Sequence, residues 1–207
     1  MMDSAFFPAT SMPDDDWWQA LWPDPMDALV KIGIAPGMSV IDLCCGNGIF
    51  TIPLVSLVGE KGRVIAIDMD ADMLSEARSR MARVTNPVQA AVCDWMEADA
   101  CKIDTILDKK DAADALIIAN TYHGVPDQAG LSLAVSRVLK PTGRFIIINW
   151  HTFPREETVI LDQPRGPKTQ VRMSPDSVAR SVAAAGFVLK EVVELSPYHY
   201  GAVFHIA

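Results

Sequence analysis

The sequence predicts an α/β fold: a Rossmann-like, seven-stranded, mostly parallel sheet with helices on both faces and an antiparallel last strand. Two observations predict this fold. Short apolar runs that suit buried strands alternate with longer stretches of helical apolar spacing along most of the chain. The first run, residues 40–43, leads through a turn of small residues into a helical pattern. Strand, glycine turn and helix in this order open a nucleotide-binding α/β unit.

The turn after the first strand, residues 45–48, is rich in small residues, so a ligand can approach the backbone there closely. Asp42 lies inside the end of the strand. Its carboxylate would repel a phosphate and attract an ammonium group. The unit therefore favours a cationic adenosyl ligand over a dinucleotide.

Acidic residues are expected at the ends of the first three strands, spaced 26 residues apart: Asp42, Asp68 and Asp94. An acid after the second strand of such a fold holds a ribose through its hydroxyls. The third acid is expected to accept a hydrogen bond from an adenine amino group, and Met69 or Trp95 to cover the ring.

The remaining elements follow in the same pattern. The sequence predicts helices at residues 25–34, 71–83, 128–139 and 174–185, and strands at 63–67, 88–93, 114–120, 143–150, 187–195 and 198–206. Residues 151–173 are irregular, and a connection this long inside a compact domain is usually functional.

Five segments in this order resemble class I S-adenosylmethionine-dependent methyltransferases: 42–48, Asp68, 93–95, 114–120 and 138–145. In 42–48, Cys44 stands where that family usually has a glycine. The resemblance covers most of the chain and implies that S-adenosylmethionine is the cofactor. The residues it assigns to cofactor binding are Asp42, Cys44, Cys45, Gly46, Asn47, Gly48, Asp68, Met69, Asp94, Trp95 and Asn120.

The resemblance implies methyl transfer to a small-molecule acceptor by in-line displacement. Methylation of a protein or RNA, and a non-catalytic adenosyl-binding module on the same fold, are the alternatives. Tyr122, His123 and His151 follow the fourth and fifth strands, where open sheets bind their ligands. We expect them to line the acceptor pocket, with a histidine as the base where one is needed. Each histidine could instead be a loop residue bonded to backbone.

Residues 1–25 are predicted to form an N-terminal extension, and residues 26–207 a single methyltransferase domain. Residues 17, 18 and 22 are tryptophans that could form a helical lid over the pocket or pack on the edge of the sheet. The first dozen residues are expected to be mobile. Arg155, Arg165, Lys168 and Arg172 make the irregular segment locally basic; they could hold an anionic acceptor group or be solvated loop charges.

Composition narrows the partners further. The formal net charge of −8 disfavours nucleic acid, which normally requires a basic face. The four cysteines form neither a CxxC metal pair nor a disulfide framework. No run approaches the length of a membrane span, and the acidic N-terminus does not suit a signal peptide. We therefore expect a cytoplasmic protein that binds no metal; the sequence does not predict its oligomeric state.

Overall fold

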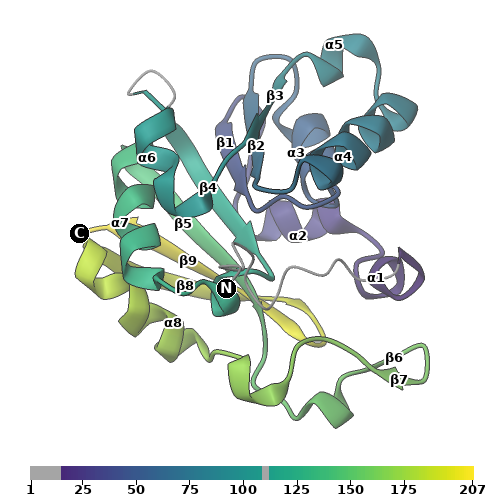
Figure 1. The fold of residues 1–207 in the computed structure, drawn as a ribbon, viewed down its shortest axis with the longest axis vertical. Helices are drawn as coiled ribbons and strands as arrows, with labels where there is room; N and C mark the ends of the chain where they lie inside the picture. The colour runs from purple at the N-terminus through teal and green to yellow at the C-terminus, as the bar shows by residue number, and fades with distance from the viewer. Residues whose placement is uncertain (1–14, 109–111) are drawn as a thin grey trace, which may run out of the picture.

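The computed structural model describes residues 15–108 and 112–207; the segment predicted to be mobile, up to about residue 12, lies outside these ranges. A seven-stranded sheet in the order β3-β2-β1-β4-β5-β9-β8 forms the centre of the molecule (Figure 1). The first five of its strands pair in parallel, and β9 pairs antiparallel with both β5 and β8. The predicted fold is confirmed.

The strands of this sheet are β1 (Ser39–Leu43), β2 (Arg63–Asp68), β3 (Cys93–Glu97), β4 (Ala113–Ala119), β5 (Leu139–Trp150), β8 (Phe187–Ser196) and β9 (His199–Ile206). The α-helices are α1 (Asp15–Leu21), α2 (Pro25–Lys31), α3 (Thr51–Val58), α4 (Ala71–Val84), α5 (Pro87–Ala90), α6 (Ile103–Ile106), α7 (Gln128–Val138) and α8 (Pro175–Val182).

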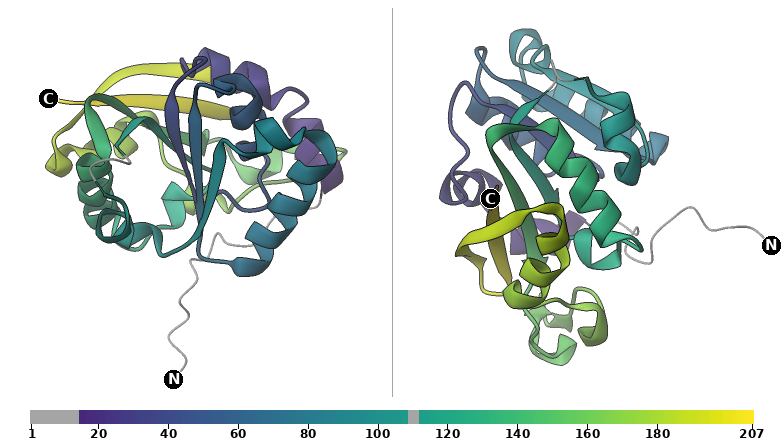
Figure 2. Two further views of the ribbon diagram at one scale, coloured as in Figure 1. Left: turned by 90° about the horizontal axis from the view of Figure 1, so that it is seen from above. Right: turned by 90° about the vertical axis from the view of Figure 1, so that its left-hand side faces the viewer.

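Two hydrophobic layers hold the helices to the sheet. On one face, residues of α1, α2, α3 and α4 pack with alternate strand residues such as Val40 and Ile146. On the other, α7 and α8 pack with the intervening strand residues, such as Ile41 and Phe145. Figure 2 shows the strands between these layers from two further directions. Alternation of this kind follows from the twofold period of strand side chains, and burial on both faces explains the nearly continuous apolar runs of the central strands.

The third strand begins five residues later than predicted, because the segment before it forms the short helix α5. The Asn86 side chain accepts from the Gln89 N–H and the Gln89 side chain accepts from the Asn86 N–H, which is a capping box, with Pro87 in the first turn. Local capping therefore overrides the apolar run, and β3 starts at Cys93.

The irregular segment between β5 and α8 contains a small two-stranded hairpin, β6 (Val159–Ile160) and β7 (Gln163–Pro164). Leu161 and Asp162 between its strands both have positive φ angles, as a tight hairpin turn requires. Helix α1 contacts β6, and Figure 1 shows both at the same end of the molecule. Among the described residues, no helix has the length and apolar character needed to cross a membrane.

Candidate active site

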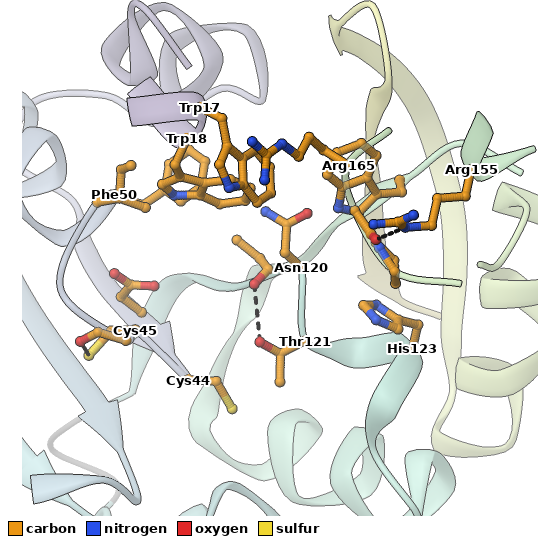
Figure 3. A pocket seen from close by; sticks show the side chains of 17 residues that line it. Trp17, Trp18, Cys44, Cys45, Phe50, Asn120, Thr121, His123, Arg155 and Arg165 are labelled. Atoms are coloured by element: carbon orange, nitrogen blue, oxygen red, sulfur yellow. Dashed lines mark hydrogen bonds between the residues drawn. The ribbon is translucent and has the colours of Figure 1, made fainter. Parts of the chain in front are cut away.

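A cavity of about 300 Å³ lies where the carboxyl ends of β1, β4 and β5 meet α1 and the segment after β5 (Figure 3). Residues from these five parts of the chain line it: Trp17, Trp18, Asp42, Cys44, Cys45, Gly46, Ile49, Phe50, Ala119, Asn120, Thr121, His123, Trp150, Arg155, Arg165, Gly166 and Pro167. Ligands of open α/β sheets bind at this kind of position, beyond the carboxyl ends of the strands.

Asp42 provides a buried negative charge on one side of the cavity. Its carboxyl group is 2% exposed and accepts a 2.5 Å hydrogen bond from the Thr51 hydroxyl, at the start of α3. Burial raises the pKa of Asp42 to about 7, against the opposing effect of the Thr51 hydrogen bond, and the nearby Asp68 raises it further. A cationic ligand beside this carboxyl group would stabilise its ionised form.

Asp68 joins the end of β2 to the glycine turn. Its carboxylate accepts from the Gly46 N–H at 2.8 Å and from the Asp70 N–H at 3.0 Å. Cys44, the residue in place of the usual glycine, has φ 59°, a left-handed conformation that non-glycine residues adopt rarely. The fold thus keeps the glycine-like backbone although a thiol side chain is attached to it.

The two adjacent cysteines in the turn are not suited to nucleophilic chemistry. Burial raises the pKa of the Cys44 thiol well above its usual value, and the charges of Asp68, Asp42 and Asp99 raise it further. Burial and the same two strand-end acids, Asp42 and Asp68, act on Cys45. A reactive cysteine needs the opposite environment, one that stabilises the thiolate. The negative potential around the turn instead favours a cation.

Asn120 lies between Cys45 on one side and Arg165 and His123 on the other, as Figure 3 shows. Its backbone N–H donates to the Ile148 carbonyl at 2.8 Å, and its φ is 60°, a conformation that asparagine tolerates better than most residues. Both polar atoms of its side-chain amide are buried without a hydrogen-bond partner in the described part of the chain. Buried polar groups are normally paired, so this amide is placed to bind a ligand.

The other side of the cavity is basic and aromatic. Arg165 lies over the ring of Trp17 at 5.4 Å, and the Arg155 Nε donates to the Gly166 carbonyl at 3.0 Å. His123 lies below them, and its Nε2 is buried with no partner within residues 15–108 and 112–207. Burial lowers the pKa of His123, so its imidazole is neutral near neutral pH and available to accept a proton.

A family model described as a methyltransferase domain matches residues 34–181. The chain belongs to this methyltransferase family. A 2-phytyl-1,4-naphtoquinone methyltransferase of Synechococcus elongatus is 36% identical over 116 residues, 56% of this chain and 47% of the relative. A demethylmenaquinone methyltransferase of Lactococcus lactis is 28% identical over 138 residues, 67% of this chain and 50% of the relative. The chain thus spans about half the length of these curated relatives.

A solved structure supports the same assignment over nearly the whole chain. The SAM-dependent methyltransferase of Aquifex aeolicus has 25% sequence identity and a TM-score of 0.78, and the match covers 94% of each chain. The resemblance to S-adenosylmethionine-dependent methyltransferases expected from the sequence is therefore confirmed.

The predicted cofactor residues do not all lie in the cavity. The cavity is lined by five of them: Asp42, Cys44, Cys45, Gly46 and Asn120. Asp68 and Met69 lie at the end of β2 beside the glycine turn. Asn47 and Gly48 belong to the turn but face α4: the Asn47 amide donates to Glu76 at 3.2 Å, and a Cβ at Gly48 would lie 3.0 Å from the Ala77 Cβ.

The predicted adenine contact through Asp94 is wrong in its premise, because Asp94 lies near the start of β3 rather than at its end. Its carboxylate is paired with Arg63, the first residue of β2, at 2.8 Å, on the edge of the sheet opposite to Asp68. Trp95 is likewise displaced and packs under the Arg78 guanidinium, 5.8 Å from its ring centre.

Asp99 occupies the position after the third strand at which Asp94 was expected. It follows the carboxyl end of β3, caps a 3₁₀ turn through the Cys101 N–H, and contributes to the negative potential at Cys44. The capping box before β3 is the sequence signal from which the later start of the strand, and hence the position of Asp99, could have been predicted.

Tyr122 and His151 were expected in the acceptor pocket, and neither lines it. Tyr122 is fully buried on the α7 and α8 side of the sheet, and its hydroxyl hydrogen-bonds Ser132 and Ser181. The His151 Nε2 lies 2.8 Å from the Glu194 carboxylate, and its ring packs on Phe153 and Tyr200. His123 is the one member of the predicted trio that reaches the cavity.

The N-terminal tryptophans divide between the two roles considered for them. Trp17 and Trp18 line the cavity, as a lid would. Trp22 packs instead on Phe50 and His199, with ring centres 5.1 and 4.8 Å apart. Of the 1–25 extension, residues 15–21 therefore form a wall of the site.

Proposed function

We propose that the protein transfers the methyl group of S-adenosylmethionine to a small-molecule acceptor, and that both bind in the cavity between Asp42 and Arg165. The observation that carries this proposal is the polarity of the cavity, with a buried carboxyl group and an unpartnered amide on one side and arginines and a histidine on the other. The two curated relatives are named for a phytyl naphthoquinone and for demethylmenaquinone, which supports a small-molecule acceptor here.

S-adenosylmethionine supplies a methyl group on a cationic sulfur, and its transfer is an in-line displacement in which the bond to the acceptor forms as the C–S bond breaks. Asp42 and Asp68 stabilise positive charge at the donor end. Asp68 is the residue we assign to the ribose hydroxyls, because it ends β2 beside the turn. Orientation of the two reactants by these walls can supply about 7–11 kcal/mol of the barrier.

His123 is the residue we assign to proton transfer. Its imidazole is neutral near neutral pH, lines the cavity and has an unpartnered Nε2 among the described residues. Where the acceptor carries a proton of high pKa, Nε2 can take it as the new bond forms. Trp17, Trp18 and the loop around Gly166 line the cavity and limit the access of water to the reacting groups.

Calorimetry with S-adenosylhomocysteine tests the donor end of the proposal. Asp68→Ala should weaken binding about tenfold, because one charge-assisted contact is lost. Asp176→Ala, an exposed acid at the start of α8, is the matched control and should bind like the wild type. An Asp68→Ala variant with unchanged affinity would remove Asp68 from the site.

Product analysis with isotopically labelled S-adenosylmethionine tests the reaction itself. Label that appears in a small molecule supports the proposal, whereas label in protein or RNA supports a macromolecular acceptor. A chain that binds the donor with no transfer would be a non-catalytic adenosyl-binding module. The cytoplasmic location stays a prediction.

A further inference from the structure

We propose that the acceptor is a flat aromatic acid whose carboxylate binds between Arg155 and Arg165 and whose ring lies among the indoles of Trp17, Trp18 and Trp150. This inference rests on the proposed methyl transfer and names its substrate class. Four features of the cavity carry it: an arginine without a counter-ion, a second arginine held by a carbonyl group, aromatic walls, and the position of the acids.

The Arg165 guanidinium lacks an anionic partner among the described residues. Its guanidinium stacks on Trp17, and its Nε is buried without a hydrogen-bond partner in the described chain. No carboxylate of residues 15–108 and 112–207 forms an ion pair with it. A buried donor without a partner costs about 1–3 kcal/mol, and more for a charged group. A ligand carboxylate would remove this cost and match the planar fork of the guanidinium.

Arg155 is oriented and still has hydrogen-bond donors to spare. Its Nε donates to the Gly166 carbonyl, and this contact turns the side chain toward the cavity. Glu156 and Glu157 follow it directly in sequence, yet neither forms an ion pair with it within the described ranges. The terminal nitrogens of Arg155 are therefore available to a second anion-binding contact.

Arg172, in the same loop, shows what a structural arginine looks like here. Its Nε donates to the Pro167 carbonyl, one terminal nitrogen donates to Phe153, and the other donates to Thr158 and Arg165. It is 7% exposed, and the loop carbonyls occupy its donors. The contrast separates an arginine that holds the loop from two that the loop presents to a ligand.

The walls beside the arginines suit a flat ring. Trp17, Trp18 and Trp150 are buried and line the cavity together with Phe50. Gly166 approaches Trp150 so closely that a Cβ there would lie 2.9 Å from the indole. Aromatic rings stack or pack edge-to-face in such surroundings, which adds about 0.5–1.5 kcal/mol per pair beyond burial.

The acids of the site lie at the other end. Asp42 is the one carboxyl group among the described residues that line the cavity, and it belongs to β1, whereas the arginines belong to the segment after β5. The formal net charge is −8, so two arginines on one wall of the cavity, neither with a counter-ion within residues 15–108 and 112–207, do not follow from the overall composition. Their placement favours an anionic ligand.

The competing interpretation is that Arg165 binds the carboxylate of the cofactor's own methionine group. This alternative predicts that loss of the arginine weakens binding of the cofactor. The aromatic acid predicts that loss of the arginine weakens binding of the acceptor alone. The two are separated by measuring both ligands on the same variants.

Benzoate and its neutral analogue benzamide are the probes, titrated into the complex with S-adenosylhomocysteine and followed by tryptophan fluorescence. We expect benzoate to bind about tenfold tighter than benzamide. Arg165→Gln and Arg155→Gln should each weaken benzoate about tenfold and leave benzamide and S-adenosylhomocysteine unchanged. Arg83→Gln, an exposed arginine at the end of α4, is the matched control and should change none of the three affinities.

The outcomes are distinguishable. Equal binding of benzoate and benzamide, or no binding of benzoate, overturns the aromatic acid. Weaker S-adenosylhomocysteine binding by Arg165→Gln reassigns this arginine to the cofactor and also overturns it. A wild-type protein that fails to bind S-adenosylhomocysteine would overturn the proposed function instead. Unchanged S-adenosylhomocysteine affinity shows that each variant is folded, and Arg165→Lys, which keeps the charge, should lie between wild type and Arg165→Gln.

Discussion

The acidic and basic sides of the cavity are built in different ways. The acidic side comes from strand ends: Asp42 and Asp68 end neighbouring parallel strands, and the backbone pairing of the sheet fixes their separation. The basic side comes from a helix and a loop, with Arg155 and Arg165 positioned by side-chain contacts to Gly166 and Trp17. In the proposed arrangement, donor binding is therefore built into the fold, whereas acceptor binding is added by segments that a fold of this kind can vary.

The largest expected effect is the difference between two histidine variants, one on the basic side of the cavity and one outside the cavity. His123→Ala should slow single-turnover methyl transfer by about 10²–10⁴-fold if the acceptor must lose a proton, because the base is removed. His151→Ala is the matched control, since His151 contacts Glu194 and does not line the cavity. Because burial lowers the pKa of His123, the rate should fall with decreasing pH only below the ordinary histidine value of 6.5. Equal rates for both variants would leave the cavity without a histidine base.

The next effect concerns the buried charge of the acidic side. Asp42→Asn keeps an acceptor for the Thr51 hydroxyl but removes the carboxylate, so S-adenosylhomocysteine should bind at least about tenfold more weakly at pH 8. Calorimetry measures this loss. Benzoate affinity should change far less, since the acceptor lies beyond Asn120. A variant that loses both ligands equally would show that the two sides are not independent.

The same variant should gain stability. The folded pKa of Asp42, about 7, lies above the ordinary value of 3.8, so the folded chain binds this proton more tightly than the unfolded chain. The contribution of this group to stability is therefore greatest below about pH 4 and is lost as pH rises to about 7. Asp42→Asn should be more stable than wild type by on the order of 2 kcal/mol at pH 8 and by much less at pH 5. Denaturant unfolding without ligand at both pH values is the measurement.

The smallest expected effect on ligand binding comes from the outer wall of the cavity. At Gly166, φ is 85° and a Cβ would meet the Trp150 indole, so Gly166→Ala should cost about 1–3 kcal/mol of stability and weaken benzoate without changing S-adenosylhomocysteine. Gly186→Ala is the matched control, because Gly186 has φ 84° and open space around it. It should show the backbone cost of about 1 kcal/mol alone. Identical results for the two alanines would mean that the Trp150 contact adds nothing.

The sequence predicted the acidic side better than the basic side for a physical reason. Asp42 and Asp68 follow apolar runs whose strand character is strong, and parallel strands bring their ends to one edge. The predicted position of Asp94 at a strand end was wrong because the capping box at Asn86 and Gln89 turns the start of the expected third strand into a short helix. A shift of five residues was enough to place that acid at the amino ends of the strands instead of their carboxyl ends.

The basic side of the cavity could not be predicted in the same way, because its segment has no periodic pattern of apolar residues. Residues 151–173 lack a regular apolar spacing, so the sequence placed four cations together without showing which would face a ligand. Arg172 and Arg165 both stack on an indole, and only their hydrogen bonds distinguish them. The Arg172 guanidinium donates to loop carbonyls, whereas the Arg165 Nε has no partner among the described residues. Tyr122 was misplaced because it begins the short 3₁₀ turn that follows β4, and a side chain there can turn into either hydrophobic layer.

The contacts of Arg172 determine which residues of the loop beside the cavity can be substituted. One guanidinium joins Phe153, Thr158, Arg165 and Pro167, and the Thr158 hydroxyl adds contacts within the same loop. The residues between these anchor points, including Val159, Leu161 and Lys168, are exposed and can be exchanged without disturbing the fastening. The exchangeable part of the loop therefore lies between fixed anchor points. Grafting other sequences between the anchors is a direct route to enzymes of new acceptor preference on an unchanged donor site.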